Sequence, residues 1–343
     1  MFFIIFVVKL SISLKIVVVV LLILVLALTF VNISLLSTNS RLLTKQKLAS
    51  TCNVDASNSD NQLLSPDLAW LNIDVFLEKQ NTVMSSYGDL EKTLSFVLDS
   101  ARGDYSLYFE DLTTGAHIGI REQEKFAPLS LLKVPLMIAT LKEIEMGVVS
   151  LNQKVVLDKE DIDFQSGKLW EKGAGYEITV KDLLIYLIKY SDNTAVYALN
   201  RHVVSEKYVI ESRLLTGLSS VSNITVDDRI SPQGYSDMLR GLYFSNYLRK
   251  PFSELGLALM SDTDFNSQLP AGLPKNIRVA HKVGVYATEG YYHDCGIIYV
   301  PGKPYLLCVM SNNTDSGEAD KIISEVSKIV YEYVTANTTA VKR

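Results

Sequence analysis

A run of apolar residues takes up almost all of positions 1–36. Lys9 and Lys15 are its only charged residues, and the segment Ile16–Leu36 carries no charge. A helix of that length can cross the hydrocarbon core of a membrane. A cleaved signal peptide is the alternative, but its apolar stretch is usually shorter and no clear small-x-small cleavage site is present. We therefore predict an uncleaved transmembrane anchor over residues 1–36.

The next segment, residues 37–65, is rich in Ser, Thr, Asn and Gln, a composition that predicts a flexible linker. Positively charged residues flank the apolar run on both sides, so the positive-inside rule does not fix its orientation. We assign residues 66–343 to a single folded domain.

Within 66–343 the hydrophobic pattern changes from helix to strand periodicity and back. Apolar spacing of three and four predicts a helix between Asp67 and Ser100, and alternation on both sides of a turn at Gly115 predicts a hairpin. The apolar segment Ala127–Leu141 predicts a buried helix, and the glycine-rich residues 147–180 predict loops. The later predicted elements are helices from Val180, at about 205–215 and 232–244, and over Gly317–Val334, with strands at Arg278–Lys282, Gly290–Val300 and Tyr305–Met310. This order predicts an α+β domain, in which both ends of the chain complete an antiparallel sheet flanked by helices, with a helical insert between them.

Composition excludes some function classes. A net charge of −5 and a pI near 5.5 argue against a nucleic acid partner. The three cysteines and four histidines have no metal-ligand spacing, so they do not indicate a metal site. We also expect no organic cofactor. Cys295 and Cys308 fall on the two strands of one predicted hairpin, where we expect buried free thiols.

Ser130 and Lys133 stand three residues apart inside the buried helix predicted at 127–141. On a helix this spacing puts the hydroxyl and the amine on one face. A buried amine loses its proton readily and can then activate a neighbouring serine. Alone, the motif fits equally well a helix-capping serine followed by a lysine whose amine reaches solvent.

Two further motifs follow, Ser191-Asp192-Asn193 and Lys282-Val283-Gly284. Together with Ser130 and Lys133, their order and type resemble the S-x-x-K, S-D-N and K-T-G motifs of class A β-lactamases and penicillin-binding proteins. Segments next to the motifs are similar as well, including Leu269–Pro274 ahead of Lys282. The resemblance covers about residues 90–335 and implies a β-lactamase/DD-peptidase-like fold.

The resemblance also implies a role for each motif residue. Ser130 is expected to be the nucleophile, Lys133 to take or relay its proton, and Ser191 to pass a proton to the leaving nitrogen. The expected substrate-binding residues are Asn193, Lys282, Gly284 and Val285, with the backbone N–H groups of Ser130 and Val285 as the oxyanion hole. Asp192 is expected to be structural.

Two positions depart from the family pattern. Val283 stands where the family has Thr or Ser, so a hydroxyl that helps to bind the substrate carboxylate is missing. The loop glutamate that primes the deacylating water is also missing, because the segment Leu215–Thr225 contains no acidic residue. Asp228 matches the carboxylate that closes that loop, and Asp227 is the one candidate for a substitute base. We therefore expect acylation through Lys133 and slow deacylation.

These observations predict a membrane-anchored serine hydrolase that forms a Ser130 acyl-enzyme with β-lactams or related amides. A second interpretation is a D-Ala-D-Ala carboxypeptidase acting on peptidoglycan peptides. A third is a β-lactam-binding sensor without turnover. All three imply a bacterial membrane protein with one membrane-spanning segment and its catalytic domain outside the cytoplasm. The sequence leaves the oligomeric state open.

Overall fold

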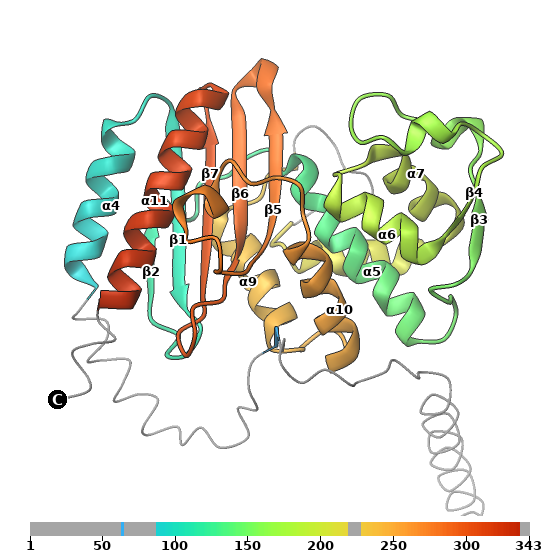
Figure 1. Cartoon of the computed structure of the whole chain (residues 1–343), viewed down its shortest axis with the longest axis horizontal. Coiled ribbons are helices and arrows are strands. Elements are labelled where there is room, and N and C mark those ends of the chain that lie inside the picture. The colour runs from blue at the N-terminus through green and yellow to red at the C-terminus, as the bar shows by residue number, and fades with distance from the viewer. Residues whose placement is uncertain (1–62, 65–86, 219–227, 337–343) are drawn as a thin grey trace, which may run out of the picture. The chain divides into compact units, whose positions relative to one another are not determined.

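Five antiparallel strands form the central sheet of the domain (Figure 1). The computed structural model describes residues 63–64, 87–218 and 228–336. The strands are β1 (Asp104–Asp111), β2 (His117–Ile120), β5 (Val279–Tyr286), β6 (Tyr291–Ile298) and β7 (Tyr305–Asn312). Their order across the sheet is β2-β1-β7-β6-β5, so the hairpin from the start of the domain pairs with the last strand. The predicted sheet completed by both ends of the chain is confirmed.

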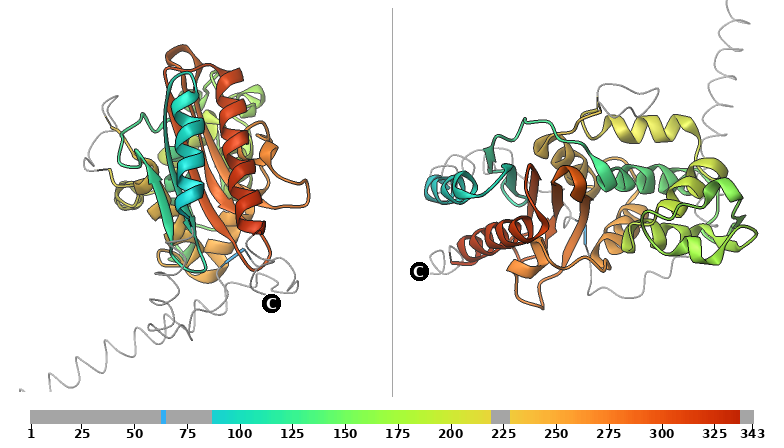
Figure 2. Two further views of the ribbon diagram at one scale, coloured as in Figure 1. Left: turned by 90° about the vertical axis from the view of Figure 1, so that its left-hand side faces the viewer. Right: turned by 90° about the horizontal axis from the view of Figure 1, so that it is seen from above.

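Two helices cover one face of this sheet. They are α4 (Gly88–Ser100) and α11 (Ser316–Ala336), which lie side by side in both views (Figures 1 and 2). Leu90, Leu94 and Leu98 of α4 are buried, as their spacing of four predicts for one helix face. They contribute to a core with the inward side chains of β1 and β7.

The other face of the sheet packs against the helical insert. Its helices are α5 (Lys133–Glu145), α6 (Val180–Lys189), α7 (Asn193–His202), α8 (Glu206–Leu214), α9 (Pro232–Tyr243) and α10 (Lys250–Ser261). Almost every residue of α5 is buried, which confirms the prediction from its apolar sequence. This helix therefore lies at the centre of the insert, and α6, α7, α8 and α10 pack around it.

Some elements were absent from the sequence prediction. They are α7, α10 and a small second sheet of β3 (Lys154–Val156) and β4 (Glu177–Thr179). The predicted helix at 127–141 is also split, because a 3₁₀ turn, η2 (Leu129–Leu132), precedes α5. Strands of three residues give too short an alternation to be recognised.

The expectation of free thiols is wrong. Cys295 on β6 and Cys308 on β7 are directly opposite each other in the ladder and form a disulfide. The hairpin was predicted but its register was not, and the register alone decides whether two cysteines face each other.

Several predictions concern residues outside the described ranges. The anchor at 1–36, the linker over 37–62 and the part of the first helix up to residue 86 belong to this group. No helix among the described residues combines the length and apolar character needed to span a membrane. Leu63 and Leu64, at the end of the predicted linker, are buried on the domain, and the Leu63 N–H donates to the Glu254 carboxylate at 2.9 Å.

Three contacts fix the segment that leads into η2. Phe126 pairs with Ile230 through two backbone hydrogen bonds of 2.8 and 2.9 Å. His293 of β6 accepts the Ser311 N–H at Nδ1, so its proton is on Nε2, which donates to the Ala127 carbonyl at 2.9 Å. A Cβ added to Gly284 of β5 would lie 3.2 Å from the Leu131 side chain. Glycine at this position thus lets η2 pack closely against β5.

The buried His293 predicts a pH dependence of stability. Burial lowers the pKa of His293 to about 4, from about 6.5 in an unfolded chain. Between these values the unfolded state binds a proton that the folded state does not, so stability falls as the pH drops from about 6.5 to about 4. The expected loss is roughly 3 kcal/mol.

Urea unfolding at a series of pH values tests this prediction. His293→Gln should flatten that part of the profile, whereas the matched change at the exposed His117 should not. Equal pH profiles for the wild type and His293→Gln would contradict the prediction.

Candidate active site

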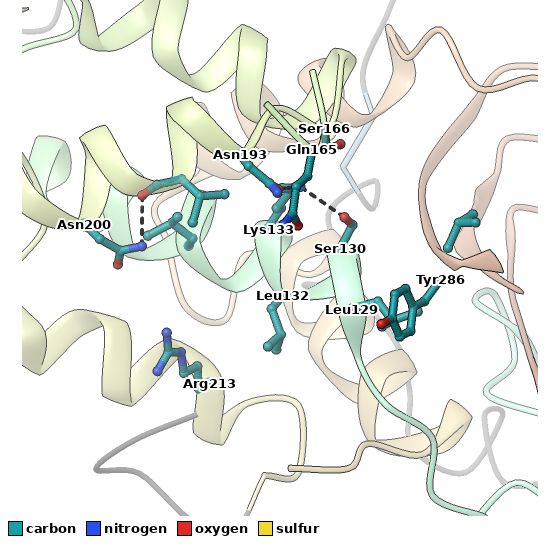
Figure 3. A pocket seen from close by; sticks show the side chains of 13 residues that line it. Leu129, Ser130, Leu132, Lys133, Gln165, Ser166, Asn193, Asn200, Arg213 and Tyr286 are labelled. Atoms are coloured by element: carbon teal, nitrogen blue, oxygen red, sulfur yellow. Dashed lines mark hydrogen bonds between the residues drawn. The ribbon is translucent and has the colours of Figure 1, made fainter. Parts of the chain in front are cut away.

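Ser130 and Lys133 come together at the junction of η2 and α5. A 3₁₀ helix has three residues per turn, so side chains three positions apart lie directly in line. The Lys133 Nζ is 3.0 Å from the Ser130 Oγ (Figure 3). Because a 3₁₀ turn precedes α5, the Ser130 and Lys133 side chains point in more nearly the same direction than they would on a regular α-helix.

Lys133 is held by two carbonyl-type oxygens. Its Nζ donates at 2.7 Å to the Ser191 backbone oxygen and at 2.7 Å to the Asn193 Oδ1, and lies 3.2 Å from the Ser191 Oγ. Burial lowers the pKa of Lys133 to about 8, although the charges of Asp192 and Asp163 act in the opposite direction. A neutral amine has two N–H groups. When the Ser191 backbone oxygen and the Asn193 Oδ1 accept these two N–H groups, the lone pair of the Lys133 nitrogen remains to accept a hydroxyl proton.

Lys282 approaches Ser191 from the other side. Its side chain is fully buried on β5, and its Nζ donates at 3.0 Å to the Ser191 Oγ and at 2.9 Å to the Val283 carbonyl. Burial and then the charge of Lys133 lower the pKa of Lys282. Two lysine amines thus share one serine hydroxyl.

The turn between α6 and α7 presents Ser191 and Asn193. Ser191 has a positive φ of 52°, an unfavourable conformation for a residue with a side chain, and Leu129 before Ser130 has 51°. Asp192 overcomes this cost, because its buried carboxylate accepts the backbone N–H groups of Lys168, Leu169 and Ala195 at 2.6, 2.7 and 3.0 Å. The expectation of a structural role for Asp192 is confirmed. It caps α7 and secures the turn.

Ser130, Lys133 and Asn193 border a cavity of about 560 Å³, a size typical of ligand sites. Its described lining contains two cations and no carboxylate: Leu129, Ser130, Leu132, Lys133, Leu136, Gln165, Ser166, Asn193, Val196, Asn200, Arg213, Val285 and Tyr286. Val285 and Tyr286, at the end of β5, are about half exposed at the rim. Val283 is buried in the strand, so the missing hydroxyl is not replaced at that position.

Some residues at or next to the cavity were absent from the sequence prediction. Ser166 donates to the Ser191 carbonyl at 2.7 Å, and Asp163 accepts from the Asn193 Nδ2 at 3.1 Å. Asn200 and Arg213 extend the cavity away from the motif residues. No short motif marks any of these residues, because they reach the site from loops and helix ends.

The candidate base Asp227 lies outside the described residues, and its role stays a prediction. Its neighbour Asp228 is buried, and its charge acts on the pKa of Arg213.

Among the described residues, Asp158, Asp161 and His202 are grouped closely enough to hold a metal ion. Other contacts occupy these groups, however. His202 Nε2 is 2.8 Å from Asp161 Oδ2, Arg201 Nε is 3.3 Å from Asp161 Oδ1, and the two aspartates form a capping box. None of these residues lines the Ser130 cavity as described. We interpret the cluster as a structural link between that capped turn and α7.

A model of the β-lactamase enzyme family matches residues 89–334. The chain belongs to this family. A β-lactamase of Streptomyces albus G is 22% identical over 268 residues, which cover 72% of this chain and 85% of that protein. The extended-spectrum β-lactamase PER-1 of Pseudomonas aeruginosa is 26% identical over 238 residues, 61% of this chain and 76% of that protein.

Solved structures agree with this assignment. PBP-A has a TM-score of 0.66 at 22% identity, covering 73% of this chain and 97% of that one. An ancestral class A β-lactamase, GNCA, has a TM-score of 0.64 at 25% identity, covering 71% of this chain and 99% of that one. The chain thus has the predicted class A-like fold and is a β-lactamase-like serine hydrolase.

Proposed function

We propose that Ser130 is the nucleophile of an acyl-transfer reaction on β-lactams or related amides. The observation that carries this proposal is the placement of the Lys133 amine. It is buried, has a lowered pKa, is fixed by two carbonyl-type oxygens and lies 3.0 Å from the Ser130 hydroxyl. These are the conditions under which a lysine acts as a general base.

The same contacts provide a route for the proton. Lys133 takes the proton from the Ser130 hydroxyl as its oxygen bonds to the carbonyl carbon. The Ser191 hydroxyl, 3.2 Å from Lys133 Nζ, gives its own proton to the leaving nitrogen as the C–N bond breaks, and Lys133 then restores it. The proton that leaves Ser130 thus balances the one gained by the nitrogen. Lys282, 3.0 Å from the Ser191 Oγ, favours this transfer by its positive charge.

The backbone N–H groups of Ser130 and Val285 are assigned to the oxyanion hole. They belong to η2 and β5, which Gly284 allows to approach each other. Asn193 and Lys282 are assigned to substrate binding, through the substrate's amide and carboxylate groups. With Val283 in place of a hydroxyl residue, the carboxylate has one hydrogen-bond donor fewer.

We further propose that the acyl-enzyme is released slowly. Hydrolysis requires a base close to the ester, and the described lining of the cavity contains no carboxylate. The sequence Leu215–Thr225 contains none either, which leaves Asp227 as the candidate. Acylation and deacylation would thus differ widely in rate.

A penicillin adduct on Ser130 is the first expected result. Intact-mass spectra of the full-length chain mixed with benzylpenicillin should show one adduct within minutes that persists for hours, and Ser130→Ala should show none. Asp227→Asn should lengthen its lifetime if Asp227 is the base. An adduct that survives Ser130→Ala would disprove the nucleophile assignment, and rapid release would disprove slow deacylation.

The rate of acylation should depend on pH through Lys133. Its neutral form is the base, and its pKa is about 8. The second-order acylation rate should therefore rise about tenfold per pH unit below pH 7 and level off above about 8. Because Lys133 and Lys282 share Ser191, the midpoint belongs to the pair.

Stopped-flow measurements with a chromogenic cephalosporin from pH 5.5 to 9.5 give this profile. Lys133→Arg keeps a positive charge but cannot lose it, and should reduce the rate at every pH by about 100-fold or more. A wild-type rate that is flat from pH 5.5 to 8 would argue against Lys133 as the base.

The alternative is a D-Ala-D-Ala carboxypeptidase acting on peptidoglycan peptides. The cavity without a described carboxylate favours it, as does the similarity to PBP-A, a mutant of which has been solved as its acyl-enzyme with penicillin G. Release of the terminal residue from such peptides, lost in Ser130→Ala, would identify it. A third possibility, a sensor without turnover, predicts a permanent adduct and no product from either substrate class.

We also propose that residues 1–36 anchor the protein in the membrane with the domain outside the cytoplasm. Two observations support this location: the uncharged segment Ile16–Leu36, and the Cys295–Cys308 disulfide, because disulfides persist in oxidising compartments. Protease added to spheroplasts should degrade the domain and leave a cytoplasmic control protein intact. Protection of the domain would contradict the proposal.

A further inference from the structure

We propose that the cavity selects acyl donors whose side chain ends in a carboxylate, which binds to Arg213. This inference rests on the proposed function, because it concerns the substituent on the carbonyl group that Ser130 attacks. It names the class of substrate that this site prefers.

Ser130 and Arg213 border one continuous cavity. Arg213 lies in the last turn of α8, and Asn200 lies in the last turns of α7. Figure 3 shows Arg213 and Asn200 on one side of Ser130 and Tyr286 on the other. Leu132, Leu136 and Val196 line the same cavity, so apolar side chains border it together with Ser130 and the guanidinium.

The Arg213 guanidinium has no hydrogen bond or ion pair with another described side chain. Its pKa is lowered by partial burial and raised by the charge of Asp228, and an arginine stays protonated despite such shifts. A partly buried cation is stabilised when an anion binds to it. A ligand carboxylate offers two oxygens that match the two parallel N–H groups of a guanidinium.

The position of Arg213 assigns this anion to the acyl side of the substrate. Ser191 and Lys282, which face the leaving nitrogen in the proposed mechanism, are not among the described residues that line this cavity, whereas Arg213 is. Asn193 begins α7, and Val196 and Asn200 follow along the same helix toward Arg213. A substrate substituent that extends from Asn193 along α7 therefore belongs to the acyl group and not to the leaving group. The substituent that fits is a short alkyl chain with a terminal acid.

Matched cephalosporins provide the test. One series carries succinyl, glutaryl and adipyl side chains, and the other carries unbranched acyl chains of the same length that end in a methyl group. The full-length wild type should acylate at least one acid about tenfold faster than its methyl partner. Arg213→Gln should remove this preference by slowing acylation by the acid compounds alone. Arg213→Lys keeps the positive charge but loses the two parallel N–H donors of the guanidinium, and should retain part of the preference.

The outcomes separate the two proposals. Acylation of both series at equal rates would overturn the inference and leave the proposed function intact. Equal slowing of both series by Arg213→Gln would overturn it too, because it would show a structural role. No adduct from any compound, nor from benzylpenicillin, would refute the proposed function and this inference with it.

Discussion

Two buried lysine amines meet at the hydroxyl of Ser191, and the rest of the site depends on this contact. Lys133 and Lys282 lie 3.2 and 3.0 Å from the same oxygen, in surroundings where burial lowers the pKa of both. Burial disfavours the charged form of each amine, and the charge of Lys133 lowers the pKa of Lys282 further. The burial that makes these cations costly also makes a base available beside Ser130.

Such a contact needs a rigid frame, because neither lysine would stay in place otherwise. Three separate parts of the chain supply it. The 3₁₀ turn aligns Lys133 with Ser130, Asp192 fixes the turn that carries Ser191, and β5 holds Lys282 in the sheet. Asp192 helps to stabilise the positive φ at Ser191, because its carboxylate accepts three backbone N–H groups around this turn. Local strain is therefore offset by a neighbouring carboxylate that touches no substrate.

The sequence predicts the helices and strands that hold the site better than it predicts the contacts between them. The apolar pattern of α5 and the alternation of β5, β6 and β7 predict those elements, and three ordered motifs bring Ser130, Ser191 and Lys282 to one site. The register that pairs Cys295 with Cys308 was not predictable, because one residue of slip would have separated them. Arg213 was not predictable either, since its place in the cavity depends on how α8 packs beside α5 rather than on a local pattern.

The departures from the family pattern have a common electrostatic consequence. The segment Leu215–Thr225 contains no acidic residue, and we expect it to lack the group that would activate water. The described cavity therefore has cations at Lys133 and Arg213 and no carboxylate between them. The carboxylates whose charges act on these two cations, Asp163, Asp192 and Asp228, are not among the lining residues. The proposed slow release of the acyl group and the proposed preference for an anionic side chain both rest on a cavity whose described lining contains no carboxylate.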